Sequence, residues 1–232
     1  MDTGSVSALV GLAFVYGLLH ALDADHIMAV SGLYGARPGT GVVRLCFNWA
    51  LGHGLILLLT GICVYILGYA LPPRFSEIAE YMVGGLLVIV GLGIARDLMS
   101  KKAQLHFHQH EGLEAHAHWY LPGAGENSHQ HKRDHRALLI GTVHGGAGAA
   151  PMLALFSLAQ TKSPWMLVAY ISIYVLGILF AMLIFGGAIG LIMKRLLKYG
   201  DRMMHIMRST AATGSVMMGL FMLRGLLPGH GI

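Results

Sequence analysis

The sequence predicts an all-α integral membrane protein with six transmembrane helices. Hydrophobic residues make up 55% of the 232 residues, and charged residues make up only 12%, whereas a soluble domain carries about 25% charged residues. Apolar runs long enough to cross a bilayer, which takes about 20 residues, recur along the whole chain. The 32 glycines suit close packing of helices in lipid.

The first half of the chain contains three of the expected spans, at about residues 7–33, 45–71 and 81–98. A Gly/Pro-rich turn at 34–40 separates the first two spans, and Pro72-Pro73 ends the second. We expect residues 1–98 to form one three-helix repeat.

The second half is expected to span at about residues 137–158, 165–193 and 203–227, with a basic loop at 194–202. Residues 137–232 would form the second three-helix repeat. The polar loop between the halves, residues 99–136, contains eight of the fourteen histidines: His106, His108, His110, His116, His118, His129, His131 and His135. Such a loop favours weak collection of metal ions over a plain linker.

Charge predicts the orientation in the cytoplasmic membrane. The loops after the first, third and fifth spans, with the flanking Arg96 and Arg208, carry 13 of the 16 Lys and Arg residues. The positive-inside rule then places both termini outside and the His-rich loop in the cytoplasm. The formal charge of +5 does not indicate nucleic-acid binding, because no basic patch is interleaved with aromatic residues.

The two halves show a faint internal repeat. Gly17-x-x-His20 matches Gly141-x-x-His144 at an offset of 124 residues, and Leu51-Gly52 resembles Leu176-Gly177. Because each half has three spans, the second copy would be inverted in the membrane, and inverted repeats place a substrate site near the midplane. The sequence therefore predicts a 3+3 inverted repeat.

The first span contains the strongest chemical signal, a cluster of His20, Asp23, Asp25 and His26. A central Asp alone costs about 2.5–3.5 kcal/mol on insertion scales, and imidazole with carboxylate is a ligand set for a divalent metal ion. On an ideal helix His20, Asp23 and His26 share one face while Asp25 points elsewhere. Either Asp25 braces the other three groups or the helix is distorted.

Two further histidines lie inside expected spans, His53 in the second and His144 in the fourth. A lone histidine in a helix is more often a packing residue than a ligand, so each is a weaker candidate alone. We include both in the expected metal site, where imidazole nitrogen and carboxylate oxygen suit nickel or cobalt. Cys46 and Cys63 are 17 positions apart on one expected helix, which places them too far apart for a disulfide.

The stretch His20-Ala21-Leu22-Asp23-Ala24-Asp25-His26-Ile27 resembles the signature of the nickel/cobalt transporter (NiCoT) family. Leu51-Gly52-His53-Gly54 is similar to the family's second signature. The resemblance implies uptake of Ni²⁺ or Co²⁺ for enzymes such as urease, with His20, Asp25, His26 and His53 as the signature residues.

The chain departs from the typical family pattern in the second half, because it has six expected spans where about eight are usual. The family's later acidic signature is absent, and Gly141-Thr142-Val143-His144-Gly145 stands in its place. This form resembles short urease-accessory-like nickel permeases, and also nickel/cobalt efflux proteins with six spans and a His-rich loop.

We therefore expect a secondary importer of Ni²⁺ or Co²⁺ that is not an enzyme and needs no cofactor beyond the transported ion. The alternatives are an efflux protein for the same ions, or a membrane metal sensor or metalloenzyme. A His-Glu-x-x-His protease motif and a Walker motif are both absent from the sequence. Besides the metal ion and membrane lipid, metallochaperones or a second copy of the chain are the partners this interpretation leaves open.

Overall fold

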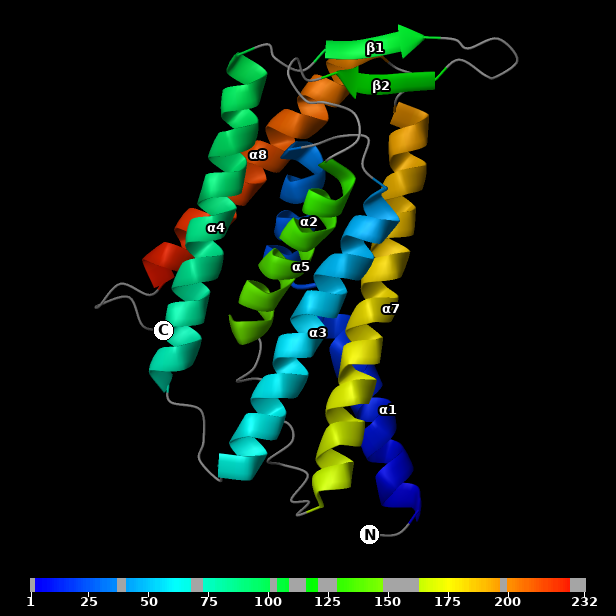
Figure 1. Cartoon of the computed structure of the whole chain (residues 1–232), viewed down its shortest axis with the longest axis vertical. Coiled ribbons are helices and arrows are strands. Elements are labelled where there is room, and N and C mark those ends of the chain that lie inside the picture. Colours follow the sequence, from blue (N-terminus) through cyan, green and yellow to red (C-terminus); the bar gives the residue numbers. More distant parts are fainter. Residues whose placement is uncertain are drawn as a thin grey trace.

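The computed structural model describes eight segments of the chain: residues 3–36, 41–67, 73–100, 104–108, 116–120, 129–147, 163–196 and 200–225. These segments form seven helices and two strands (Figure 1). The bounds are α1 Thr3–His20, α2 Ala24–Ala36, α3 Val42–Leu67, α4 Pro73–Met99, β1 Gln104–His108, β2 His116–Tyr120, α5 His129–Ala147, α7 Pro164–Leu196 and α8 Asp201–Gly225.

Four of the helices, α3, α4, α7 and α8, are long and apolar enough to cross a membrane. The pair α1 and α2 passes the same test as one broken span, which gives up to five spans in the described part of the chain. The chain is thus a multi-pass helical membrane protein. The expected fourth span is described only as far as Ala147 in α5, so residues 148–158 and the count of six lie outside the described residues.

The first span is broken in the middle of the cluster of His and Asp residues. Its two halves meet at a bend of 52°, and α1 ends at His20 while α2 begins at Ala24. The Asp23 carbonyl accepts the Ile27 N–H at 3.2 Å, which makes Asp23 the N-cap of α2, a position that Asp favours. Asp25 lies in the first turn of α2, where a carboxylate is stabilised by the helix dipole. Of the two arrangements left open by the sequence, the structure has the distorted helix.

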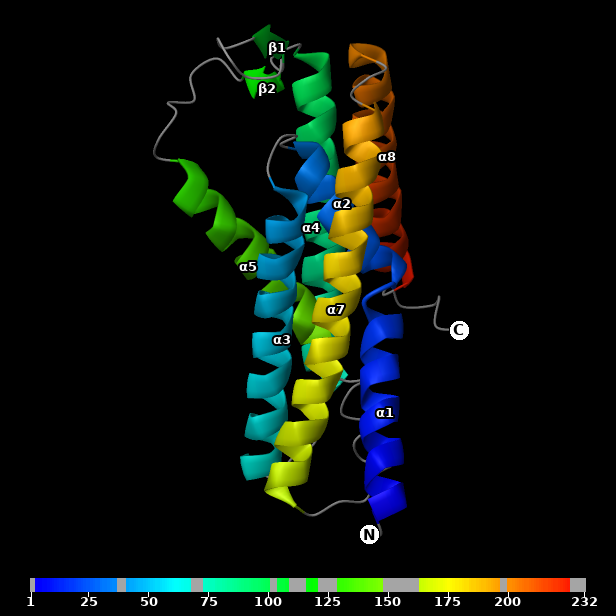
Figure 2. The same ribbon diagram turned by 90° about the vertical axis from the view of Figure 1, so that its right-hand side faces the viewer.

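The long helices pack side by side along the long axis of the molecule, and α2 lies among them (Figures 1 and 2). One apolar core joins α1, α2, α3, α5 and α7, and includes Trp49, Leu57, Tyr174 and Ile178. A smaller core joins α2, α4, α5 and α8 around Ala29, Val83 and Leu87. The half-helix α2 contributes to both cores, so its position is fixed from two sides.

Two close helix contacts depend on glycine, and their residues are related by nearly constant offsets in the sequence. A Cβ on Gly17 of α1 would overlap the Tyr174 carbonyl of α7, and a Cβ on Gly141 of α5 would overlap the Trp49 carbonyl of α3. The two glycines are 124 positions apart in the sequence, as are His20 and His144. The two aromatic residues are 125 positions apart. The α1–α7 contact and the α5–α3 contact are therefore built in the same way.

The buried Arg208 of α8 fixes the far end of α2. Its Nε donates to the Gly35 carbonyl at 2.9 Å, and its Nη2 lies 4.0 Å from Asp97 Oδ2 on α4. A carbonyl in the last turn of a helix has no partner within that helix. Arg208 supplies one and links α2 to α8 and α4.

Part of the polar segment between the halves has regular secondary structure. It contains an antiparallel pair, β1 and β2, so the expectation of helices alone misses these strands. The helix α5 begins at His129, inside this polar segment, eight positions before the expected start of the fourth span at 137. The expected boundary follows the change in hydropathy, whereas the helix continues beyond it.

Candidate metal site

Three histidines from three helices, α1, α2 and α3, meet at the break in the first span. One ligand nitrogen each from His20, His26 and His53 can be chosen so that all lie within 4.8 Å of one another. The ring centroids are 4.6 Å apart for His20–His26, 5.0 Å for His26–His53 and 5.4 Å for His20–His53. The break turns the start of α2 so that His26 meets the end of α1, and α3 supplies His53.

These imidazoles have nitrogen atoms without a protein partner. Among the described residues, Nε2 of His20 and His26 and both ring nitrogens of His53 are buried and have no hydrogen-bond partner. An unsatisfied buried polar group typically costs about 1–3 kcal/mol. A metal ion bound through the ring nitrogens would satisfy all three imidazoles at once.

Two histidines are held with Nε2 free. The Nδ1 of His20 lies 3.0 Å from Asp23 Oδ2, and the Nδ1 of His144 lies 3.2 Å from the Ile140 carbonyl. A carboxylate or carbonyl oxygen accepts only, so Nδ1 must donate in both cases, and Nε2 carries the lone pair. Metal-binding histidines are commonly oriented by this kind of outer bond.

The carboxylates lie on one side of the cluster. Asp23, Asp25 and His26 form a second group whose ligand atoms lie within 4.8 Å of one another, and Asp25 Oδ1 is 3.3 Å from His26 Nδ1. The Asp23 side chain is 56% exposed, whereas that of Asp25 is 20% exposed. His26 belongs to both three-residue groups and is the centre of the site.

Two aromatic rings pack against the histidines of the site. Trp49, one turn before His53 on α3, stacks on the His53 ring at 5.0 Å and meets the rings of His26 at 5.0 Å and His144 at 5.5 Å. Tyr174 of α7 stacks on His20 at 5.8 Å. Trp49 and Tyr174 are fully buried, so their contacts with the imidazoles lie inside the protein.

All six residues expected from the sequence lie in this region, although not equally close. His144 enters from α5 with its ring 5.8 Å from that of His26, and is not part of the tight three-histidine group. The sequence did not predict Trp49 and Tyr174, whose signal was their spacing of 125 residues and their positions three residues before Gly52 and Gly177. The half-buried carboxylate of Glu80 lies within the span formed by α4, a position that the sequence did not predict.

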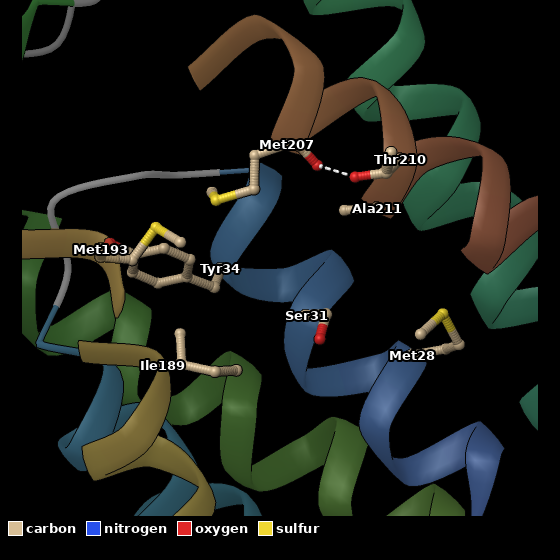
Figure 3. Close-up of a pocket in the computed structure, with 8 residues that line it drawn as sticks. All are labelled: Met28, Ser31, Tyr34, Ile189, Met193, Met207, Thr210 and Ala211. Atoms are coloured by element: carbon tan, nitrogen blue, oxygen red, sulfur yellow. Dashed lines mark hydrogen bonds between the residues drawn. The ribbon is translucent and has the colours of Figure 1, made fainter. Parts of the chain in front are cut away.

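A cavity of about 270 Å³ lies along α2, beginning one turn after Asp25 (Figure 3). Its walls come from α2, α7 and α8, and Figure 3 shows three thioethers around it: Met28, Met193 and Met207. Ser31 and Tyr34 continue the α2 wall toward the end of that helix. This cavity adjoins the part of α2 between the metal site and Arg208.

The chain is 28% identical over 192 residues to the urease accessory protein UreH of Bacillus sp. (strain TB-90). The match covers 82% of this chain and 80% of that protein. No family model matches the chain, and no solved structure matches it. The similarity to a urease accessory protein thus extends through both halves.

Proposed function

We propose that the protein is a secondary transporter that imports Ni²⁺ or Co²⁺ across the cytoplasmic membrane. The observation that carries the proposal is the buried group of His20, His26 and His53, whose nitrogens converge and include four without a protein partner. Similarity to a urease accessory protein supports a nickel-related role. The resemblance of the His-Asp signature to the NiCoT family also implies uptake of nickel for enzymes such as urease. Co²⁺ is the second proposed cargo, and only the ligand chemistry supports it.

The proposed ligands are His20, His26 and His53, with Asp23 and Asp25 supplying negative charge and His144 completing the ring of imidazoles. Imidazole favours first-row transition metals, whereas Mg²⁺ and Ca²⁺ favour oxygen ligands. A site rich in nitrogen therefore selects Ni²⁺ or Co²⁺ against the more abundant Mg²⁺. The two carboxylates offset the charge of a divalent ion that would be costly at membrane depth.

We also propose that residues 1–98 and 137–232 are inverted repeats joined by the segment 99–136. The paired contacts of Gly17 with Tyr174 and of Gly141 with Trp49 support this reading. So do the ring pairs His20–Tyr174 and His144–Trp49, which join the same equivalent positions. Broken helices at a repeat interface are where secondary transporters bind their ions.

The proposed release route follows the cavity along α2. It starts at Met28, adjacent to the site, and is bordered farther along by Tyr34 and Met207. In the proposed orientation, with both termini outside, this route leads toward the cytoplasm. There the His-rich segment, and metallochaperones if they take part, would receive the ion.

The test is uptake of radiolabelled Ni²⁺ at nanomolar concentration, with Mg²⁺ at millimolar concentration, by cells that express the protein. Net accumulation above cells without the protein supports import. A fall in cell nickel below that of control cells overturns import in favour of efflux, the second candidate function. No change in cell nickel contradicts both transport proposals.

A further inference from the structure

The strand pair in the polar segment has a register that gathers histidines. The strands β1 and β2 are antiparallel, with His106 opposite His118 and His108 opposite His116. All four histidines of the two strands are therefore in two directly opposed pairs. Backbone pairing sets this arrangement, which cannot be read from the irregular spacing of histidines along the sequence.

Both pairs also fall on one face of the ribbon. Successive residues of a strand alternate between faces, and 106, 108, 116 and 118 have the same parity within a register that pairs even with even positions. The other face receives the apolar positions Leu105, Phe107, Ala117 and Trp119. The four histidine positions therefore share one face with the pair Gln104 and Tyr120, and the opposite face holds only apolar positions.

The spacing of the four positions suits a metal ion. Opposed residues have Cβ atoms about 4.5–5.5 Å apart, and neighbours two apart on one strand are separated by about 6.8 Å. An imidazole binds a first-row ion at about 2.0–2.1 Å. Two opposed positions are therefore close enough for histidines there to share one ion, and the second pair of positions lies two residues along the strands.

We propose that this hairpin is a defined binding site for one divalent first-row transition-metal ion, formed by His106, His108, His116 and His118. The site is separate from the cluster around His26, and the proposal does not depend on transport. It differs from loose collection by a histidine-rich chain, because it requires the register and one particular face. At the end of the molecule where α4 and α7 end and α8 begins (Figure 1), the site would hold an ion outside the helix bundle.

The test compares purified full-length protein with a face-swap variant, His106→Phe combined with Phe107→His, which keeps composition and histidine count. Both proteins also carry His26→Ala, so that the intramembrane cluster does not contribute. Equilibrium dialysis with Ni²⁺, and separately with Zn²⁺, measures the number of ions held and their affinity. The matched control is His129→Ala with His131→Ala, which removes two histidines of the same segment outside the hairpin.

We expect one saturable ion on the parent protein, at least tenfold weaker binding in the face-swap variant, and parent-like binding in the control. Equal binding by parent and face-swap overturns the proposal in favour of collection by composition alone. So does a loss in the control as large as that in the swap. Thermal unfolding of all three proteins in detergent checks folding, and a second variant, His118→Gln, must also weaken binding. Failure of Ni²⁺ uptake in cells would leave these outcomes unchanged, so the two proposals fail separately.

Discussion

At the scale of single residues, His26 connects the two kinds of potential ligand in the candidate site. It shares one three-residue group with two imidazoles and another with two carboxylates. Its side chain is 3% exposed and its Nε2 has no partner among the described residues. We therefore assign His26 the central role in ion binding, and expect neighbouring residues to differ in importance according to their distance from it.

The replacement His53→Ala should weaken Ni²⁺ binding more than His144→Ala. His53 belongs to the three-histidine group, whereas His144 lies 5.8 Å from His26 by ring centroids and outside that group. We expect a loss of more than 100-fold for His53→Ala and of about 10–100-fold for His144→Ala, the range seen for outer partners of metal sites. The apparent KM for nickel uptake measures both, with the exposed His205 of α8 replaced by Ala as the control. A larger loss for His144→Ala would reverse our assignment.

Arg208→Met should lower the thermal unfolding temperature in detergent. The variant loses a charged hydrogen bond to the Gly35 carbonyl, worth about 1.5–3 kcal/mol, while the 4.0 Å pair with the partly exposed Asp97 adds at most about 1 kcal/mol. Arg202→Met, at an exposed position of the same helix, is the control and should change little. If both variants unfold at the wild-type temperature, Arg208 does not anchor α2.

At this scale the sequence predicted the polar residues of the site better than the apolar ones. Four ionisable groups within seven positions of a membrane span are costly in lipid, so His20, Asp23, Asp25 and His26 are conspicuous. Trp49 and Tyr174 resemble ordinary core residues, and only packing shows that their rings cover the histidines. Glu80 was missed because it precedes the expected start of the third span at 81.

At the scale of elements, the break between α1 and α2 gives the site its shape. A continuous helix would not place Asp25 and His26 as the structure does, because α2 is turned by 52° relative to α1. The signal was present in the sequence, since an Asp N-cap followed by an acidic first turn typically starts a helix. Inside a long apolar run this signal competes with the expectation of one uninterrupted span.

Gly52→Ala should separate α3 from α5 and disturb His53, the next residue. A Cβ at position 52 would overlap the Leu138 carbonyl, and backbone cannot rotate away as a side chain can. Overpacking of this kind costs about 1–3 kcal/mol, which exceeds the gain of up to about 1 kcal/mol for Gly→Ala in a helix. We expect a lower unfolding temperature and weaker uptake of Ni²⁺.

The matched control for that change is Gly93→Ala on α4, where an added Cβ meets nothing within 4 Å. It should leave uptake unchanged and keep or raise the unfolding temperature. Equal behaviour of the two alanine variants would show that the α3–α5 contact tolerates separation.

Ser31→Phe should slow transport by filling the cavity along α2. Ser31 lines the cavity between Met28 and Tyr34 (Figure 3), and a benzyl group there obstructs the proposed release route without removing a ligand. We expect a lower maximal uptake rate with equilibrium Ni²⁺ binding within about threefold of wild type. Ser209→Phe at an exposed position of α8 serves as the control. An unchanged rate for Ser31→Phe would exclude this cavity as the route.

The polar segment shows what a hydropathy pattern leaves out at the scale of elements. Histidine alternates with apolar residues in both strands, as Leu105-His106-Phe107-His108 in β1 and His116-Ala117-His118-Trp119 in β2. This period of two favours a strand. The prediction for this segment depended on its number of histidines and not on their alternation. The start of α5 at His129 was not predicted, because the expected start of the span at 137 follows the change in hydropathy.

At the scale of the whole molecule, glycine contacts and ring pairs join positions that are offset by 124 or 125 residues between the two halves. The sequence carried only the faint match of Gly17-x-x-His20 to Gly141-x-x-His144, too short to fix which helices would touch. Three-dimensional packing adds the partners Tyr174 and Trp49 on α7 and α3. The orientation in the membrane and the direction of transport depend on charge bias and remain proposals.

Import needs no ATP if the membrane potential drives it. An inside-negative potential favours entry of a divalent cation by about 4.6 kcal/mol per 100 mV, twice the value for one charge. At about 1.4 kcal/mol per tenfold change, this supports more than about a thousandfold accumulation. The direction of net movement should therefore follow the potential.

The central claim, that the ion passes through the buried histidine cluster, is tested most directly by Ni²⁺ entry into proteoliposomes under a potassium diffusion potential. With right-side-out protein and an inside-negative potential, we predict rapid entry by the wild type and by His205→Ala, and background entry by His26→Ala at equal protein content. Wild-type entry by His26→Ala would contradict the account.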